Sequence, residues 1–451
     1  MNQGGRRNTA TKVWLFLAGL GSYTEVHFFG SIAISELFFY ALAPLLFFKN
    51  YAALRRDGFL PWVWLTILVC VGCFISSKVN GTYWLFMLKG IAVPAVYFSA
   101  TIVFHHLLRK DPSAVKWFLI GLFLSSIISI FIFQRETFTV QGGEMQTGED
   151  AVDAVVGNPL FWAGKINAVL KLPINCFYLS VPLPYSVAAP IVGAIITVLT
   201  SGNTGRAAAA VSVAASACIF FGGKSRFKQA WVGRHIILFL VAGVFVAFAV
   251  KTVYSHAASS GLMGESAKTK YERQTEMGSG LLDILMAGRM ELFCGLRACI
   301  DRPIIGFGPR TEDRYGYAER FYKKYGTHED VQNYFRTVQL YLSRTGGFPP
   351  IPDHSHLVYF WLRYGVFGLT LWMFVFWQMF MYFRRYSSAV PQWYGYMCLT
   401  IPSMCWSILF NPPGGRTSTT FFVVCLLMCR AIYKRRIMLP FEMEMEAQHA
   451  R

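Results

Sequence analysis

The chain has 451 residues, of which 54% are hydrophobic and only 15% are charged. That balance excludes an ordinary soluble protein of this size and favours one polytopic membrane domain. The formal net charge of +18 would indicate a nucleic-acid partner in a soluble protein. Here the basic residues lie mainly between apolar segments, where they mark membrane topology, so we expect no nucleic-acid partner.

Twelve segments are apolar enough to cross a membrane, each near the ~20 residues that a helical span needs. We therefore expect an all-α polytopic membrane protein of about 12 spans. The sixth segment is the weakest, because charged residues and a proline interrupt it. The predicted spans are 12–29, 31–48, 60–77, 84–106, 115–133, 159–180, 184–200, 206–221, 234–252, 354–382, 391–410 and 417–434.

The distribution of basic residues predicts the orientation of these spans. With the N-terminus in the cytoplasm, the inner segments hold 19 lysines and arginines and the short outer segments hold four. Such an asymmetry indicates that both termini are cytoplasmic. We expect a bundle of about nine spans over 1–252, a large outer loop over 253–353, and about three spans with a cytoplasmic tail over 354–451.

The outer loop contains an amphipathic helix, predicted over 281–301, with Arg289 in the middle of its apolar stripe. This arginine either reaches back to lipid headgroups or presents its guanidinium to a phosphate at the membrane surface. Pro303 then begins a turn that contains Gly306 and Gly308 and leaves its backbone accessible.

Three further cations are candidates for an anionic substrate. Arg206 ends a turn of small residues on the outer side, and Lys89 lies about five residues from the outer end of the fourth span. Arg416 lies where the last span begins. Each could instead be an interfacial residue, although a lysine inside a span must find water or a partner.

The sequence Asp353-His354-Ser355-His356 opens the tenth predicted span. A neutral imidazole at a water interface is well suited to accept a proton near pH 7, although a single histidine at a helix start is more often structural. His354 and His356 would lie about 200° apart on a helix, so they cannot easily share one role. Asp353 either caps the helix or orients a histidine.

Together, Arg206, Arg289 and His354, with Lys89 and Arg416 as additions, make a basic site that suits a lipid-linked phosphate or pyrophosphate. We see no metal-ligand pattern and expect neither metal nor cofactor. Cys70 and Cys73 form a CxxC inside an apolar run, where packing is a better explanation than redox chemistry.

One motif adds a family resemblance. His354 and Ser355, nine residues and then Gly365 and Gly368 match the O-antigen ligase pattern of His, then Asn, Ser or Gln, nine residues and Gly-x-x-Gly. Arg289 and the glycine turn after Pro303 resemble the family's loop arginine and glycine turn. Residues 201–206 resemble its Ser/Thr-rich arginine turn, although here Gly205 precedes Arg206. Residues 157–159, Gly-Asn-Pro, resemble a further family element, and the resemblance covers about residues 150 to 410.

The chain thus resembles the O-antigen ligase and polymerase superfamily of bacterial polysaccharide assembly. The resemblance implies a GT-C-like helical fold in the bacterial inner membrane. It implies a metal-independent, inverting transfer of a glycan from undecaprenyl pyrophosphate to a hydroxyl of the lipid A core, or of another glycan, on the periplasmic face. Arg206 and Arg289 would bind the pyrophosphate, and His354 would activate the acceptor hydroxyl.

Two alternatives stay open. A polymerase would join repeat units on the same lipid carrier, and the His-Ser-x9-Gly-x-x-Gly pattern favours the ligase over it. A transporter would also fit twelve spans, but transporters tend to show paired halves and polar residues at the membrane midplane. In this chain the candidate charges gather on one side of the membrane, and a long loop breaks any symmetry.

Overall fold

The computed structural model describes residues 3–27, 31–132, 185–192, 205–223, 290–326, 328–411 and 415–449, with single positions at 252, 256, 259, 260 and 272. Of the residues described, 82% are helical. Two short strands, β1 (Glu25–His27) and β2 (Ser31–Ala33), pair with each other in antiparallel orientation. The prediction of a mainly helical membrane protein is confirmed, because five of the helices are long and apolar enough to cross a membrane.

Each of these five helices coincides with one predicted span. They are α2 (Ile34–Arg56), α3 (Leu60–Val79), α4 (Trp84–Lys110), α18 (Val366–Met381) with the π-helical turn that follows it, and the first part of α20 (Arg416–His449). Four other predicted spans correspond to α1 (Gln3–Leu20), α5 (Val115–Ile132), α9 (Gly205–Gly223) and α19 (Tyr394–Phe410). The predicted spans 159–180 and 234–252, and most of 184–200, lie outside the described residues.

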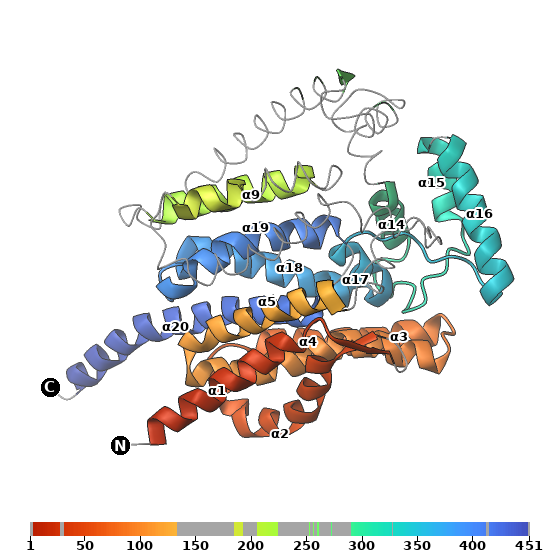
Figure 1. The fold of residues 1–451 in the computed structure, drawn as a ribbon. Coiled ribbons are helices and arrows are strands. Elements are labelled where there is room, and N and C mark those ends of the chain that lie inside the picture. Colours follow the sequence, from red (N-terminus) through yellow and green to blue (C-terminus); the bar gives the residue numbers. More distant parts are fainter. Residues whose placement is uncertain are drawn as a thin grey trace.

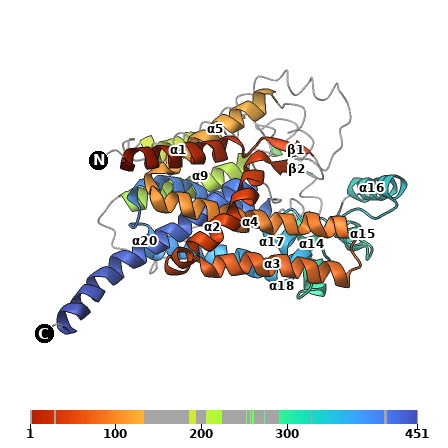
Figure 2. The same ribbon diagram turned by 90° about the horizontal axis from the view of Figure 1, so that it is seen from below.

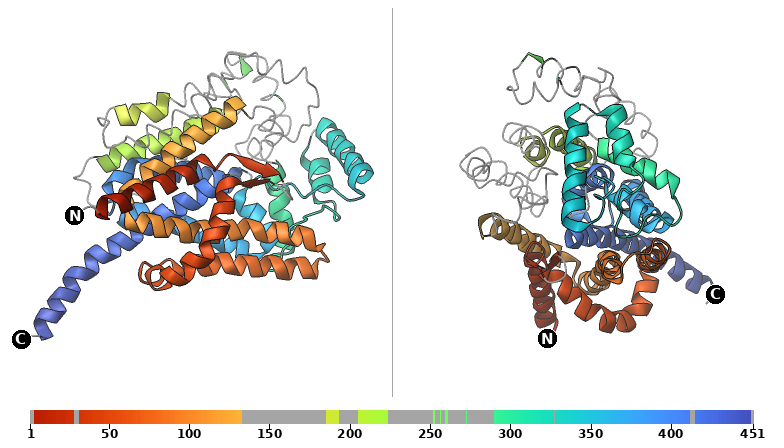
Figure 3. Two further views of the ribbon diagram at one scale, coloured as in Figure 1. Left: turned by 60° about the horizontal axis from the view of Figure 1, so that its bottom comes forward. Right: turned by 90° about the vertical axis from the view of Figure 1, so that its right-hand side faces the viewer.

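Most helices of the bundle run along one long axis, with α2 bent across them, and the extramembrane helices gather at one end of that axis (Figure 1). These are α14 (Met290–Asp301), α15 (Tyr317–Tyr325) and α16 (His328–Thr345). Both chain termini lie at the opposite end, as Figures 1 and 2 show. The C-terminal part of α20 extends away from the bundle there (Figure 3).

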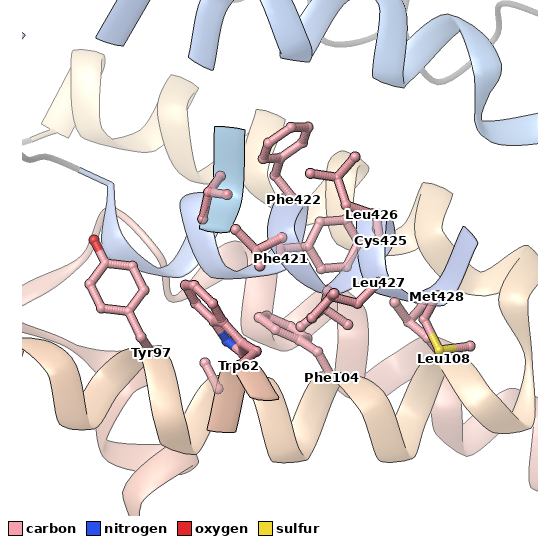
Figure 4. Packing of buried hydrophobic residues seen from close by; sticks show 14 of the residues in the cluster. Trp62, Tyr97, Phe104, Leu108, Phe421, Phe422, Cys425, Leu426, Leu427 and Met428 are labelled. Atoms are coloured by element: carbon pink, nitrogen blue, oxygen red, sulfur yellow. The ribbon is translucent and has the colours of Figure 1, made fainter. Parts of the chain in front are cut away.

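The centre of the bundle is an aromatic contact between helices distant in sequence (Figure 4). Phe421 of α20 stacks on Phe118 of α5, with ring centroids 3.8 Å apart, and meets Phe104 of α4 edge-on at 5.0 Å. All three rings are fully buried. Aromatic pairs contribute beyond their buried area, which explains why α20 occupies the middle of the bundle.

The tenth predicted span, 354–382, is not one helix. It divides into α17 (His356–Tyr364) and α18, with Gly365 between them at φ +62° and ψ −148°. Only glycine adopts that backbone conformation readily. A Cβ on Gly365 would also collide with the carbonyl of Ile304. Hydrophobicity does not predict this break, because the sequence stays apolar on both sides of Gly365.

Two buried carboxylates connect α2 to α20. Glu36, in the first turn of α2, accepts from Arg416 Nε at 2.8 Å and is 3% exposed. Asp57, just after α2, pairs with Arg435 of α20 and lies 2.9 Å from His105 Nε2 of α4. Burial raises the pKa of Asp57, but the hydrogen bonds from His105 and Arg435 outweigh it, so the pKa is lowered overall.

Replacing Gly365 with Ala should destabilise the protein by more than the ~1–3 kcal/mol of a residue held in a backbone conformation that only glycine favours, because the methyl group also meets the Ile304 carbonyl. Gly81→Ala is the matched control, since Gly81 has the same φ of +62° with no atom within 4 Å of its Cβ position. Thermal unfolding in detergent measures both. Equal losses in the two variants would contradict the contact.

Asp57→Asn should cost about 1.5–3 kcal/mol, the range for hydrogen bonds to charged groups. The stabilisation from a carboxyl with a lowered pKa is complete above its unfolded pKa of about 3.9 and is lost as the pH falls through the folded value. Unfolding temperatures measured across acidic pH should therefore converge between variant and parent at low pH. Arg56→Gln is the control. The Arg56 side chain is 64% exposed and its Nε lies 3.8 Å from Asp57, so this ion pair is long and screened by solvent.

Candidate functional site

The Ser355 hydroxyl fixes the start of α17. Its Oγ accepts from the Val358 amide at 3.2 Å, as an N-cap does, and donates to the Ile408 carbonyl of α19 at 2.8 Å. The helix begins at His356, so the prediction that His354 opens the helix is wrong by two residues. His354 instead lies on the segment that leads into the cap.

The nine residues between Ser355 and Gly365 are α17 itself. Ser355 is the N-cap and Gly365 the C-cap of this helix. The spacing in the motif is therefore the length of one short helix between a capping hydroxyl and a glycine. A Cβ on Gly368 would collide with the Phe360 carbonyl, so the second glycine of the motif lets α18 cross closely over α17.

His354 pairs with a carboxylate that the sequence prediction missed. Its Nδ1 lies 2.9 Å from Oε2 of Glu291, in the first turn of α14, and the two side chains are 43% and 41% exposed. A carboxylate at Nδ1 keeps the proton on that nitrogen and leaves Nε2 as an acceptor. The pair is therefore arranged as a solvent-accessible general base with an orienting acid.

Asp353 has neither of its two predicted roles. Ser355 caps the helix, and the Asp353 carboxylate forms an ion pair with Arg363 in the last turn of α17. The Arg363 guanidinium in turn lies over the Tyr359 ring, 3.6 Å from its centroid. Asp353 thus holds the segment before α17 against the helix, and Glu291 is the acid that contacts His354.

α14 reaches His354 because the turn that follows it is fixed to α17. The Phe307 amide donates to the Leu362 carbonyl at 2.6 Å, and the Val366 amide donates to the Ile304 carbonyl at 3.0 Å. The Trp361 indole donates to the Pro303 carbonyl at 2.9 Å. The predicted glycine turn and the predicted histidine motif, 50 residues apart, therefore form one unit.

The predicted cations are not brought together in the described part of the chain. Arg289 directly precedes α14 and lies outside the described residues. Arg206 is the second residue of α9, and its side chain is not described. Arg416 pairs with Glu36 in the link between α2 and α20.

Lys89 lies exposed on α4, with its ammonium 5.9 Å from the centroid of the Phe86 ring. The Arg310 guanidinium lies 4.9 Å from the same ring, so a second cation from the loop joins Lys89 there. His356 is buried and meets the Trp372 ring at 5.2 Å, away from the exposed His354. The two histidines therefore lie in different environments, one buried and one accessible to solvent.

Glu291 carries no signal of its own in the sequence. It follows Arg289 by two residues, in a loop helix already singled out. An acid in an amphipathic helix is usually a solvated residue, and nothing local distinguishes this one.

The two cysteines of α14 are not candidate nucleophiles. Burial raises the pKa of the Cys294 and Cys299 thiols well above their usual range, so α14 supplies no thiolate nucleophile.

Within the described ranges, no three His, Cys, Asp or Glu side chains gather closely enough to hold a metal ion. The chain matches no protein-family model, no protein of curated function and no solved structure. The resemblance to O-antigen ligases stays a prediction carried by its motif residues.

Proposed function

We propose that this chain is a membrane glycosyltransferase of the O-antigen ligase type. It moves a glycan from undecaprenyl pyrophosphate to an acceptor hydroxyl, with the lipid A core as the acceptor. The observation that carries the proposal is the contact of 2.9 Å between His354 Nδ1 and Glu291 Oε2. It gives the histidine of the motif an orienting acid and leaves the imidazole exposed.

In the proposed reaction, the acceptor oxygen attacks the anomeric carbon of the donor sugar. His354 Nε2 takes the hydroxyl proton as the new C–O bond forms. The bond from the anomeric carbon to the pyrophosphate breaks, and its electron pair leaves with the pyrophosphate. Arg289 and Arg206 stabilise that charge, with Lys89 at the outer end of α4 as a further cation, and attack from the opposite face inverts the anomeric centre.

The polar pairs of the bundle support the proposed orientation. Asp57 lies near Arg109 at 3.6 Å and pairs with Arg435, and both arginines come from segments predicted to be cytoplasmic. α14 to α16 lie at the end opposite to both termini (Figure 1). We therefore propose a GT-C-like arrangement of about 12 spans in the bacterial inner membrane, with cytoplasmic termini and a periplasmic loop.

His354→Ala should lower the rate of glycan transfer by about 10²–10⁴-fold, the usual contribution of a general base. Glu291→Gln should lower it less, because the imidazole keeps its place but loses the carboxylate that orients it. Transfer of labelled glycan in proteoliposomes measures both. His328→Ala, in the exposed part of α16, is the control. A normal rate in His354→Ala would remove the base assignment.

Arg289→Lys should reduce transfer by about tenfold or more, because a lysine keeps the charge but not the two parallel donors that a phosphate accepts. Arg297→Lys, in α14, is the control, since the Arg297 side chain is 68% exposed and pairs only with Asp301 in the described structure. The same proteoliposome assay applies. Equal rates in the two variants would show that bidentate binding by Arg289 is not used.

The acceptor is tested in cells, with a deletion strain complemented by the parent gene or by His354→Ala. A gel of surface lipopolysaccharide is the readout. A ligase predicts a bare lipid A core while polymer remains on the lipid carrier. A core that carries a single repeat unit would identify a polymerase instead.

A further inference from the structure

The turn after α14 exposes two large apolar side chains. We call residues 303–305 the isoleucine turn. Ile304 is 67% exposed and Ile305 is 39% exposed, although the residues on either side of this turn are polar or buried. Apolar side chains that stand out from an otherwise fixed backbone indicate a contact surface.

Hydrogen bonds fix the depth of this turn relative to the bundle. The Ile304 carbonyl accepts from the amide of Val366, which is the first residue of the spanning segment Val366–Tyr386. The Pro303 carbonyl accepts from the Trp361 indole. The isoleucine turn therefore lies beside the point where a membrane-spanning helix begins.

The exposed surface continues from the turn along that helix. Val366, Met373 and Trp377 are 36%, 53% and 55% exposed. Their spacing of seven and then four residues places them on one face of α18. In a spanning helix such an exposed apolar face contacts acyl chains. Val366 is both the first residue of this face and the residue bonded to Ile304.

Polar groups at the same level suit lipid headgroups. Arg302 directly precedes the turn and donates to Asn80 Oδ1 at 2.8 Å, and Asn80 is the residue that ends α3. Lys78 lies in the last turn of α3, with its ammonium 5.8 Å from the Phe74 ring centroid. Arginine and lysine beside an apolar surface at the end of a span are typical of the membrane interface.

We propose that the isoleucine turn is inserted among the acyl chains at the outer face of the membrane that the chain spans, and that it anchors the loop there. The occupant of this surface is lipid, not a protein partner. The anchor lies directly after α14, whose first turn holds Glu291, so it would set the height of the His354–Glu291 pair above the bilayer. The inference needs only the membrane-spanning helices and does not depend on the proposed reaction.

The test uses the full chain in nanodiscs of phosphatidylethanolamine and phosphatidylglycerol, in which part of the acyl chains are brominated near the ester. Ile304→Cys and Ile305→Cys each carry a bimane label, and the parent chain labelled in parallel gives the background from its own cysteines. Met373→Cys on α18 is the reference for lipid contact. Leu340→Cys is the matched control, because Leu340 is apolar and 43% exposed but lies on α16, further out along the bundle axis (Figures 1 and 2).

The proposal predicts bromine quenching at Ile304 and Ile305 within about twofold of that at Met373 and several-fold above that at Leu340. Quenching at both isoleucine positions no stronger than at Leu340 would overturn it. A blue-shifted label without bromine quenching would also overturn it, because it would show that protein and not lipid covers the turn. The two positions are substituted separately, so a folding defect in one variant leaves the other as a test.

Discussion

The backbone contact between the isoleucine turn and Gly365 is the constraint on which the outer part of the described structure depends. Contacts between the α14 segment and the α17 segment occur in the same order along both. Glu291 meets His354, Cys299 Sγ lies 3.8 Å from the Val358 carbonyl, and Ile304 bonds to Val366. The two segments thus run in the same direction. A contact fixed at their C-terminal ends therefore determines which side chains meet at their N-terminal ends, where the candidate base lies.

That constraint gives the motif a physical meaning that a sequence pattern alone does not have. A capping hydroxyl, nine helical residues and a glycine define a helix whose end can receive a backbone carbonyl from another segment. Any side chain at position 365 would displace Ile304, and with it α14. The histidine before the cap is kept out of the helix, where its ring can be exposed and paired. Gly365, eleven positions after His354, thereby determines whether His354 and Glu291 meet.

The five helices that are long and apolar enough to span a membrane each overlap a span predicted from the sequence, because the apolar composition of a segment largely decides whether it can lie in a bilayer. The sequence predicted less about pairing. Arg416 was assigned to substrate, whereas its partner in the structure is Glu36, 380 positions away, and no local pattern joins them. Glu291 was missed for the same reason, since its partner lies beyond the whole of α15 and α16. The break at Gly365 was missed because hydrophobicity is continuous across it, although the glycine itself was noticed.

The ion pairs of the two buried carboxylates at the ends of α2 are separated by a distance that can be compared with the thickness of a bilayer. Their arginine partners, Arg416 and Arg435, lie 19 positions apart on α20. At ~1.5 Å per residue that is about 28 Å, close to the ~30 Å of a bilayer's hydrocarbon core. A charged pair is least costly where the hydrocarbon ends, so the two pairs mark its boundaries. Thr417 follows Arg416, and its hydroxyl lies 3.1 Å from the Ser35 hydroxyl of α2. A second polar contact therefore joins α2 and α20 beside the Arg416–Glu36 pair. α2 and α20 are thus held in register by an ion pair at each end of α2, on either side of the aromatic core.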